Sequence, residues 1–243
     1  MIMVVGMLLA GGVGKRMGAD VPKQFLEVAG KPIILYPLEI MEKHPLIDAV
    51  EVVCVESYIP EIKNIVATAG LTKVKWVVSG GATAQESINK GIVALRDKMD
   101  KDDILLVHMS SYPLADADIM TDCIESAIKN GNGCAARPIL YSAFFTDDKK
   151  TSTKQIDRDR LMLGTIPYAF IFGEVSELYE RAFREGKGIE GNVFANTLYC
   201  DYGKTLYFTK DSETNMKVTT SRDIKLMEAY LKIMQEEENS GEQ

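Results

Sequence analysis

A glycine-rich loop with two basic residues follows the first apolar stretch of the chain. Residues 9–25 read LAGGVGKRMGADVPKQF. Glycines so close together let backbone N–H groups turn inward toward an anion, and a following helical turn adds its dipole. Arg16 and Lys23 bring two cations to the same end of the expected sheet. This combination of backbone donors and cations predicts a phosphate-binding site.

Two familiar phosphate-binding motifs do not fit this loop. A P-loop needs Ser or Thr after its lysine, whereas Lys15 is followed by Arg16. A dinucleotide-binding motif needs a third glycine, where the chain has Met17, and an acidic residue about 20 positions on. Glu56 comes later than that, so an NAD(P)-binding reductase rests on the glycines alone. A plain structural turn would leave Arg16 and Lys23 without a role.

The elements that would position this loop follow the pattern of a parallel sheet with crossover helices. Strands are expected at residues 2–9, 49–55, 74–78, 103–108, 133–140 and 204–209. Helices are expected near residues 33–43, 59–69, 85–98, 116–129, 173–186 and 221–235. Residues 141–160 are polar and turn-rich, which predicts an excursion from the core in the form of an arm.

Length and composition predict one soluble domain over residues 1–235, followed by a disordered acidic tail at 236–243. The net charge of −7 argues against a nucleic-acid-coating surface or a polybasic membrane anchor. No apolar run approaches the ~18 residues of a membrane span. Four cysteines without C-x-x-C spacing are typical of reduced thiols in a cytoplasmic protein. The chain has only His44 and His108, too few for a histidine-rich zinc site.

The opening loop resembles the L-A-G-G-x-G-x-R-M motif of the sugar-nucleotide-type nucleotidyltransferases. PKQFLEVAGKPII, residues 22–34, is similar to the branch of methylerythritol-phosphate and ribitol-phosphate cytidylyltransferases. The resemblance continues through residues 78–92 (VSGGATAQESINKGI), 156–161 (IDRDRL) and 215–224 (NMKVTTSRDI). It implies an α/β Rossmann-like nucleotidyltransferase fold, with a mixed, mostly parallel sheet flanked by helices and a protruding β-arm. It also implies a transferase that moves CMP from CTP to a polyol or sugar phosphate and releases pyrophosphate.

The resemblance further implies roles for single residues. Arg16, Lys23 and Lys217 would stabilise charge on the phosphates, with Lys217 shared between nucleotide and acceptor. The nucleotide-binding set would be Ala10, Gly11, Gly12, Gly14, Gly81, Ala82 and Ser87. The family commonly has an arginine where this chain has Ala84, and residues 79–83 could also be only a strand-to-helix turn capped by Thr83. Arg158 would reach the acceptor phosphate of a neighbouring subunit, which predicts a homodimer through the arm.

The residues that match the acceptor-binding motifs of the family differ from the family pattern in this chain. The family usually reads V-H-D-A-A-R-P where this chain reads VHMSSYP, so Met109 replaces an aspartate and Tyr112 an arginine. Ile166 replaces a threonine, and residues 190–194 (EGNVF) replace an acidic stretch. The acceptor-binding residues would then be Arg158, Tyr112 and Ile166. These changes disfavour methylerythritol phosphate as the acceptor, and they leave open a catalytically impaired relative that binds a nucleotide or a partner protein.

The replacement of the aspartate by Met109 also changes how a metal ion is expected to bind. Mg²⁺ would be held mainly by the nucleotide phosphates, with no protein side chain as a metal ligand. Asp116 and Asp118 would replace the lost carboxylate only if the loop before them folded back. His108, at the end of a strand, is expected to be a hydrogen-bonded structural residue.

Overall fold

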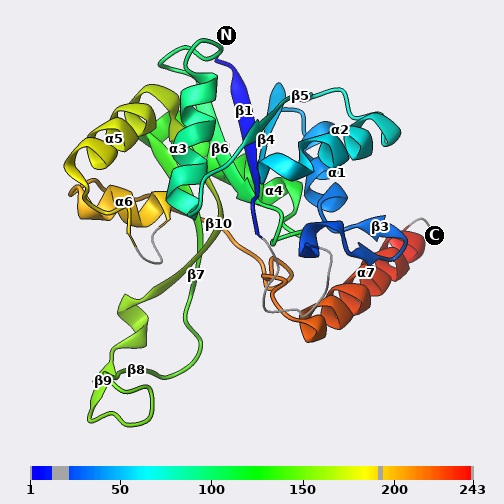
Figure 1. The fold of residues 1–243 in the computed structure, drawn as a ribbon. Helices are drawn as coiled ribbons and strands as arrows, with labels where there is room; N and C mark the ends of the chain where they lie inside the picture. Colours follow the sequence, from blue (N-terminus) through cyan, green and yellow to red (C-terminus); the bar gives the residue numbers. More distant parts are fainter. Residues whose placement is uncertain (1, 13–21, 191–193, 242–243) are drawn as a thin grey trace.

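The computed structural model describes residues 2–12, 22–190 and 194–241. A seven-stranded sheet forms its centre, in the order β11-β7-β10-β6-β1-β4-β5 (Figure 1). Neighbouring strands are parallel, except that β10 runs antiparallel to both β6 and β7. The strands are β1 (Val4–Ala10), β4 (Ala49–Cys54), β5 (Val74–Ser79), β6 (Ile104–Met109), β7 (Asn132–Pro138), β10 (Met162–Ile171) and β11 (Phe208–Thr209). The expected Rossmann-like fold with a mixed, mostly parallel sheet is confirmed.

Helices cover both faces of the sheet, and the alternation of side chains along β1 shows how each face is buried. Val5, Met7 and Leu9 pack with α3, α5 and α6, whereas Val4 and Leu8 pack with α1 and α4 on the opposite face. The helices are α1 (Leu35–Lys43), α2 (Ile59–Thr68), α3 (Ala84–Leu95), α4 (Ala117–Asn130), α5 (Phe172–Glu185) and α6 (Ala195–Asp201). Because both faces are covered, the central strands β1, β4 and β6 are buried throughout and mostly apolar.

Strand β10 is the one central element that the sequence prediction missed. Its sequence, MLGTIPYAFI, contains Pro167, and a proline argues against a central strand because it has no N–H to donate. The structure accommodates Pro167 at an irregularity, since the register with β7 shifts between Gly164 and Tyr168. Regular pairing with β6 begins only at Tyr168.

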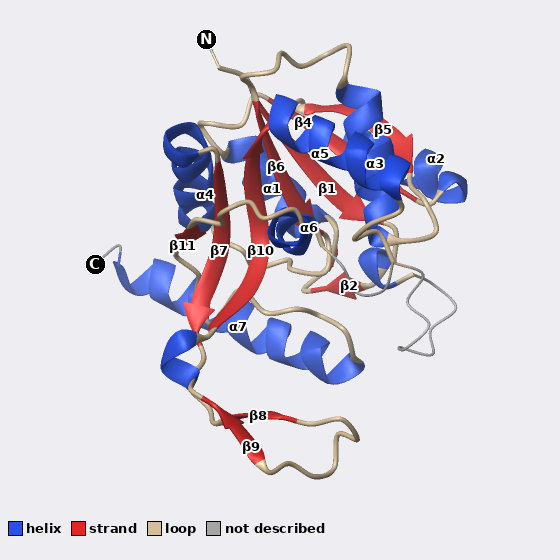
Figure 2. Cartoon of the chain, turned by 90° about the vertical axis from the view of Figure 1, so that its left-hand side faces the viewer, coloured by secondary structure: helices blue, strands red, loops and turns tan. Residues whose placement is uncertain are grey.

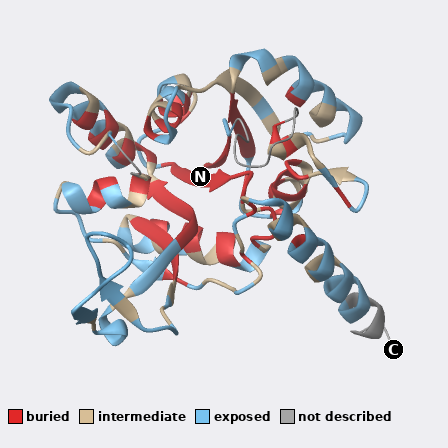
Figure 3. Ribbon diagram, turned by 60° about the horizontal axis from the view of Figure 1, so that its bottom comes forward, coloured by how far each residue is buried: buried red, intermediate tan, exposed pale blue. Residues whose placement is uncertain are grey.

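A smaller unit lies beside the carboxyl ends of the central strands. It combines the hairpin β2 (Glu27–Val28) and β3 (Lys31–Pro32) with α7 (Ser221–Gly241) around a third apolar cluster. Val28, Leu114, Val218 and Met227 are among the buried members of this cluster. The outer part of α7 extends away from the core (Figure 3). The helix continues past residue 235 to Gly241, where the sequence analysis expected a disordered tail.

The expected arm is present between β7 and β10 (Figure 2). It carries the hairpin β8 (Ala143–Phe145) and β9 (Lys154–Ile156), then the short 3₁₀ helix η3 (Arg158–Arg160). The arm exposes four large apolar side chains, namely Leu140, Tyr141, Phe144 and Phe145. Such a concentration of exposed apolar side chains on one projection is typical of an interaction surface.

Two further findings concern the chain as a whole. None of the described helices is both long and apolar enough to cross a membrane. Cys54, Cys123 and Cys134 are buried and Cys200 is exposed, and all four are free thiols.

Strand β4 carries a buried carboxyl group in the core. Glu51 is fully buried, and neither of its carboxylate oxygens has a hydrogen-bond partner. The carboxyl group lies against α3, where a Cβ added at Gly91 would come within 2.7 Å of Glu51 Oε2. Burial raises the pKa of Glu51 to about 8, although the charge of Lys98 acts in the opposite direction. The carboxyl group is therefore neutral in the folded protein at pH 7.

This burial makes the stability of the fold depend on pH. In the unfolded chain Glu51 ionises near its ordinary pKa of 4.5, so between pH 4.5 and 8 the folded state binds more protons. Stability from this group is complete below about pH 4.5 and is lost as the pH rises toward 8. Glu51→Gln should therefore raise the free energy of unfolding by on the order of 3 kcal/mol at pH 7, and by little at pH 4.5.

Denaturant unfolding of both proteins at several pH values measures this difference. Glu125→Gln, on the exposed face of α4, is the matched control and should change stability by a similar small amount at every pH. A Glu51→Gln effect that does not grow with pH would contradict the assignment of a neutral, buried Glu51.

Candidate active site

Two adjoining cavities lie where parallel central strands end. The carboxyl ends of β1, β5 and β6 meet at one edge of the sheet, which is the usual place for a ligand in an open α/β sheet. The first cavity has a volume of about 300 Å³. The residues that line it are Leu9, Gly11, Gly12, Lys23, Gly81, Ala82, Thr83, Ala84, Ser87, Met109, Ser110, Ser111, Phe194 and Lys217.

The structure thus brings together most of the predicted nucleotide site. One cavity is lined by five residues of the predicted set and by two of the predicted cations, namely Gly11, Gly12, Gly81, Ala82 and Ser87, with Lys23 and Lys217. Ala10 does not line it, since it is fully buried at the end of β1 and its carbonyl accepts a hydrogen bond from Gln24 Nε2 at 3.0 Å. Gly14 and Arg16 lie outside the described residues, so their predicted roles stay predictions.

The backbone of Val218 connects three segments of this site. Lys23 Nζ donates a hydrogen bond to the carbonyl of Val218 at 3.0 Å, and the Val218 N–H donates to the carbonyl of Ser111 at 2.8 Å. Ser111 lies in the loop after β6, which is itself joined to β1 because the Ser110 N–H donates to the carbonyl of Leu9. Val218 is fully buried in the third apolar cluster, so these bonds are shielded from water.

The loop between β5 and α3 is organised by its own side chains. Ser87 Oγ accepts a hydrogen bond from the Gly81 N–H at 3.0 Å and donates to the carbonyl of Thr83 at 2.9 Å. Thr83 caps α3 by accepting a hydrogen bond from the Glu86 N–H at 3.1 Å, and Glu86 Oε2 accepts one from the Ala82 N–H at 2.7 Å. Ser87 and Ala82 both belong to the predicted nucleotide-binding set. In this conformation the Ser87 hydroxyl and the Ala82 N–H hold the loop in shape by bonding within it.

Gly81 cannot be replaced without moving this loop. A Cβ added there would overlap the side chain of Glu86 and approach its backbone carbonyl carbon to 3.1 Å. The close approach of the loop to the start of α3 thus requires glycine for reasons of space, not of an unusual backbone angle. Residues 79–83 can therefore be a capped strand-to-helix turn and a nucleotide-binding loop at once, because the cap fixes the shape of the cavity wall.

The loop after β6 closes as a tight turn around His108. The Tyr112 N–H donates to the carbonyl of Met109 at 2.9 Å, and His108 Nε2 lies 2.9 Å from the carbonyl of Tyr112. His108 is fully buried, and this burial lowers its pKa to about 4. A neutral ring with its proton on Nε2 donates to Tyr112, so His108 supports the turn, in agreement with its expected structural role.

The second cavity adjoins the first and has a volume of about 330 Å³. Met109, Phe194 and Lys217 line both cavities, so a ligand in one lies next to a ligand in the other. The remaining lining residues are Tyr112, Met162, Gly164, Ile166, Tyr168, Asn196, Thr197 and Phe208. Its walls are thus mostly aromatic and aliphatic, with an amide, a hydroxyl group and the ammonium of Lys217 as polar features.

Tyr112 and Ile166, two of the predicted acceptor-binding residues, both line the second cavity, and their role toward an acceptor stays a prediction. The strand that supplies Ile166 and Tyr168 was missed. Phe208 also went unnoticed, because nothing in residues 204–209 distinguishes a cavity wall from an ordinary edge strand. Asn196 and Thr197 begin α6, a helix that the sequence prediction left out. In the sequence, two differences from the family pattern, at Ile166 and at residues 190–194, indicated that the residues around the acceptor had changed.

The first two carboxylates that follow Met109 in the sequence do not enter the site. Asp116 caps α4, with its Oδ1 accepting a hydrogen bond from the Ile119 N–H at 2.9 Å. Asp118 is exposed and lies 3.8 Å from Lys210 Nζ. No carboxylate is among the described residues that line the two cavities. Across the described ranges, no group of three His, Cys, Asp or Glu side chains could hold a metal ion.

Arg158 lies on the arm and lines neither cavity of its own chain. Its side chain is 54% exposed, and its guanidinium donates to the carbonyl of Leu140 at 2.8 Å. Its predicted contact with the acceptor of a neighbouring subunit stays a prediction.

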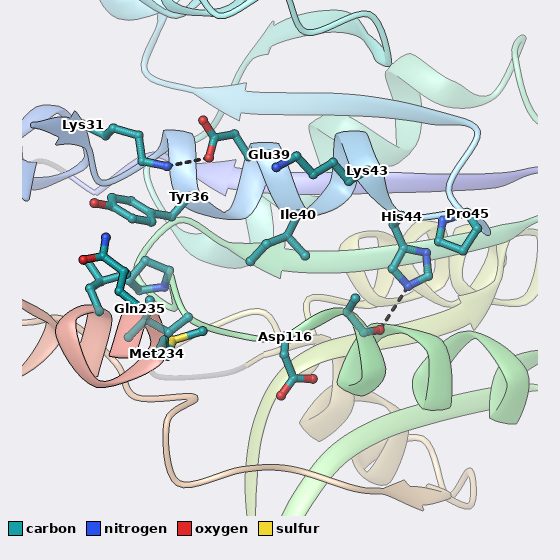
Figure 4. A pocket seen from close by; sticks show the side chains of 14 residues that line it. Lys31, Tyr36, Glu39, Ile40, Lys43, His44, Pro45, Asp116, Met234 and Gln235 are labelled. Carbon is teal, nitrogen blue, oxygen red and sulfur yellow. Dashed lines mark hydrogen bonds and ion pairs between the residues drawn. The ribbon is translucent and has the colours of Figure 1, made fainter. Parts of the chain in front are cut away.

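A larger cavity, of about 480 Å³, lies between α1, α7 and the start of α4 (Figure 4). None of the predicted site residues lines it. Ile40 and Met234 face it from α1 and α7, and an ion pair of 2.6 Å joins Lys31 and Glu39 at one end. His44 is buried beside it and bonds to the carbonyl of Ala117 at 3.0 Å. Its charged groups are of both signs, so they favour no ligand class.

The sequence matches known cytidylyltransferases along nearly its whole length. A family model described as IspD: 2-C-methyl-D-erythritol 4-phosphate cytidylyltransferase matches residues 3–233. The ribitol-5-phosphate cytidylyltransferase of Lacticaseibacillus paracasei is 39% identical over 230 residues, which cover 95% of this chain and 98% of the relative. The 2-C-methyl-D-erythritol 4-phosphate cytidylyltransferase of Geotalea uraniireducens is 31% identical over 236 residues, covering 96% and 99%.

The fold also has close structural neighbours. The crystal structure of 4-diphosphocytidyl-2C-methyl-D-erythritol synthase from Anaerococcus prevotii superposes with a TM-score of 0.80. The two chains share 21% sequence identity, and the match covers 95% of this chain and 96% of that chain. At this identity the likeness supports the fold.

Removal of the Ser87 hydroxyl should weaken nucleotide binding. Ser87→Ala leaves the Gly81 N–H without its partner and loosens the cavity wall, at a cost of about 1–2 kcal/mol. We expect the affinity for Mg²⁺-CTP, measured by calorimetry, to fall by about 5- to 30-fold. Ser126→Ala, on α4, removes a similar hydroxyl-to-carbonyl bond, to Asn132 at the start of β7, and should leave CTP binding unchanged. Equal CTP affinities in the two variants would rule out this role for Ser87.

Proposed function

The chain belongs to the IspD family of cytidylyltransferases, and we propose that it transfers CMP from CTP to ribitol 5-phosphate. Cytidylyl transfer to a phosphorylated polyol is the activity that the family match and the names of the relatives share. The relative with 39% identity is named for ribitol 5-phosphate, whereas the one with 31% identity is named for methylerythritol phosphate. The rewritten loop at Met109 and Tyr112 also favours an acceptor other than methylerythritol phosphate.

The observation that carries this proposal is the position of Lys217 in the lining of both cavities. In the transfer, an oxygen of the acceptor phosphate attacks the α-phosphorus of CTP. The bond from that phosphorus to the bridging oxygen breaks, and pyrophosphate leaves with the electron pair. A cation between the two cavities can attract the acceptor phosphate and stabilise charge on the α-phosphate in the same step.

The chain needs no general base for this reaction. The acceptor phosphate is largely a dianion at pH 7, so its oxygen attacks without losing a proton to the protein. This agrees with the neutral His108, which is fully buried and bonded to the turn. Lys23, tied to the carbonyl of Val218, supplies a second cation on the nucleotide side. We propose that Arg16, in the loop that precedes Lys23, supplies a third cation.

Mg²⁺ is the cofactor that we propose. It would neutralise part of the triphosphate charge and enter with CTP, held mainly by phosphate oxygens. The chemistry of the cavity walls supports this assignment, because the described lining residues offer hydroxyl groups at Ser110 and Ser111 but no carboxylate. Those hydroxyl groups are weak Mg²⁺ ligands compared with carboxylates.

A second candidate function is nucleotide binding with little or no transfer. It is favoured by Met109, a thioether at a position that lines both cavities, and by the largely apolar wall of the acceptor side. Loss of a charge-assisted contact of a few kcal/mol corresponds to on the order of 10²–10³ in rate. Slow transfer is therefore expected even if the enzyme assignment is correct.

A homodimer assembled through the arm is the third part of the proposal. The exposed Leu140, Tyr141, Phe144 and Phe145 support it, because one projection presents all four to solvent. Arg158 lies on the same arm, so pairing of two arms would deliver its guanidinium to the second cavity of the partner.

The transfer is tested by incubating the protein with Mg²⁺-CTP and ribitol 5-phosphate and measuring pyrophosphate release and CDP-ribitol. We expect slow turnover, below ~1 s⁻¹. Lys217→Ala should lower kcat/KM by at least about 10²-fold, because it removes a cation from the reacting phosphates. ATP and GTP should replace CTP poorly, because a wall built from Gly81, Ala82 and Ser87 suits the edge of a pyrimidine better than that of a purine. Methylerythritol phosphate should be a negligible acceptor.

The outcomes separate the two candidates. Tight CTP binding without product from ribitol 5-phosphate or other polyol phosphates would favour the binding function. Equal or better binding of purine nucleotides would contradict the cytidylyl assignment itself.

The dimer is tested by light scattering at micromolar concentration. We expect twice the mass of the 26.9 kDa chain for the wild type, and a monomer for Phe144→Asp, because a charge would be buried between the arms. Leu226→Asp, at an exposed apolar residue on α7, is the matched control and should stay dimeric. Arg158→Ala should stay dimeric but raise KM for the acceptor. A wild-type monomer would contradict the proposal.

A further inference from the structure

The ammonium group of Lys217 lies between two aromatic rings at the boundary of the two cavities. Lys217 Nζ is 5.7 Å from the ring centroid of Tyr112 and 5.7 Å from that of Phe194. Tyr112 belongs to the turn after β6, and Phe194 directly precedes α6. The two rings therefore approach the lysine from separate parts of the chain. Both distances are within the range in which the face of a ring attracts a cation.

The backbone around each ring is fixed by hydrogen bonds. Tyr112 is bonded through its N–H to Met109 and through its carbonyl to the buried His108. The Thr197 hydroxyl donates to the carbonyl of Phe194 at 2.9 Å and accepts from the Phe194 N–H at 2.9 Å. These bonds fix the backbone positions from which the two rings project toward the lysine.

The backbone next to Lys217 is bonded to the same turn that carries Tyr112. Residue 218, next to it, donates its N–H to the carbonyl of Ser111, which precedes Tyr112. This bond sets the segment of Lys217 beside the turn that carries the first ring. Burial raises the pKa of Tyr112, so its ring faces the ammonium group as a neutral phenol.

We propose that Tyr112 and Phe194 are positioning residues, which hold the Lys217 ammonium group at the place where the two phosphates meet. The proposal rests on the transfer reaction proposed above and adds the residues that orient its shared cation. A lysine side chain has four rotatable bonds and many rotamers, so an unsupported ammonium group would spend little time at one point. Each ring face that attracts the ammonium group restricts it further.

Tyr112 and Phe194 thus have a role that their polarity alone does not indicate. Replacement of an aromatic ring by leucine keeps the wall apolar but removes the attraction for the ammonium group. The effect should appear in kcat and in the affinity for phosphate groups, and it should depend on the presence of Lys217.

The test compares Tyr112→Leu, Phe194→Leu and Lys217→Ala, alone and combined, in the full-length protein. Two readouts are measured: kcat and KM for CMP transfer, and the affinity for inorganic pyrophosphate by calorimetry. Because Lys217 is an exposed residue, Tyr112→Leu and Phe194→Leu should each weaken pyrophosphate binding by about 2- to 5-fold and lower kcat by a similar factor. In the Lys217→Ala background, Tyr112→Leu should have no further effect on either readout. Tyr112→Phe, which keeps the ring, should recover most of the loss.

Tyr202 offers a matched control. Its ring also carries cations over its face, with Lys187 Nζ at 4.7 Å from the centroid, but it lines neither cavity. Tyr202→Leu should leave pyrophosphate affinity and kcat unchanged. Thermal melting identifies any variant that fails to fold, and Phe194→Leu tests the proposal independently if Tyr112→Leu is unstable.

The outcomes separate this proposal from the one it rests on. If Tyr112→Leu weakens pyrophosphate binding equally with and without Lys217, the rings do not act through the lysine and the proposal is overturned. The same holds if Tyr112→Phe loses as much as Tyr112→Leu. If the wild type transfers no CMP but the pyrophosphate affinities follow the expected order, the transfer reaction fails and the positioning role stands.

Discussion

Two hydrogen bonds to the backbone of Val218 join three segments of the chain that are far apart in sequence. One bond comes from Lys23 in the first third of the chain, and the other goes to Ser111 in the middle. Because Val218 is fully buried, these bonds do not compete with water. The predicted phosphate-binding cations therefore depend on a residue that has no chemical role of its own. A change that expelled Val218 from its apolar cluster would displace Lys23, Lys217 and the turn after β6 together.

The sequence predicted the parts of the fold that a local pattern encodes. Apolar runs identified the parallel strands, and Gly11, Gly12 and Lys23 of the predicted phosphate-binding loop line one cavity at the carboxyl ends of these strands. Strand β10 was missed because Pro167 normally excludes a central strand, and only tertiary pairing shows that a register shift accommodates it. The extension of α7 to Gly241 was likewise missed, since a run of glutamates is compatible both with a solvated tail and with an exposed helix.

The candidate site shows a different limit of sequence reasoning. Tyr112 was interpreted only as the loss of an arginine, because a single sequence does not reveal what a substituted side chain contacts. The structure shows its ring facing Lys217, a residue more than a hundred positions away. Ser87 shows the converse, since the motif identified the residue correctly while its hydroxyl bonds to the loop and not outward. Residue identities were thus predictable, whereas the partners that determine their roles were not.

The buried Glu51 has a consequence for the thermodynamics of the whole chain. Its pKa of about 8 in the folded state means that the core carries a proton at pH 7, and unfolding releases that proton to the solvent. The heat of unfolding must then include the heat of ionisation of whichever buffer accepts the proton. Calorimetric enthalpies of this protein would therefore differ between buffers at the same pH, although the covalent structure and the final unfolded ensemble are the same.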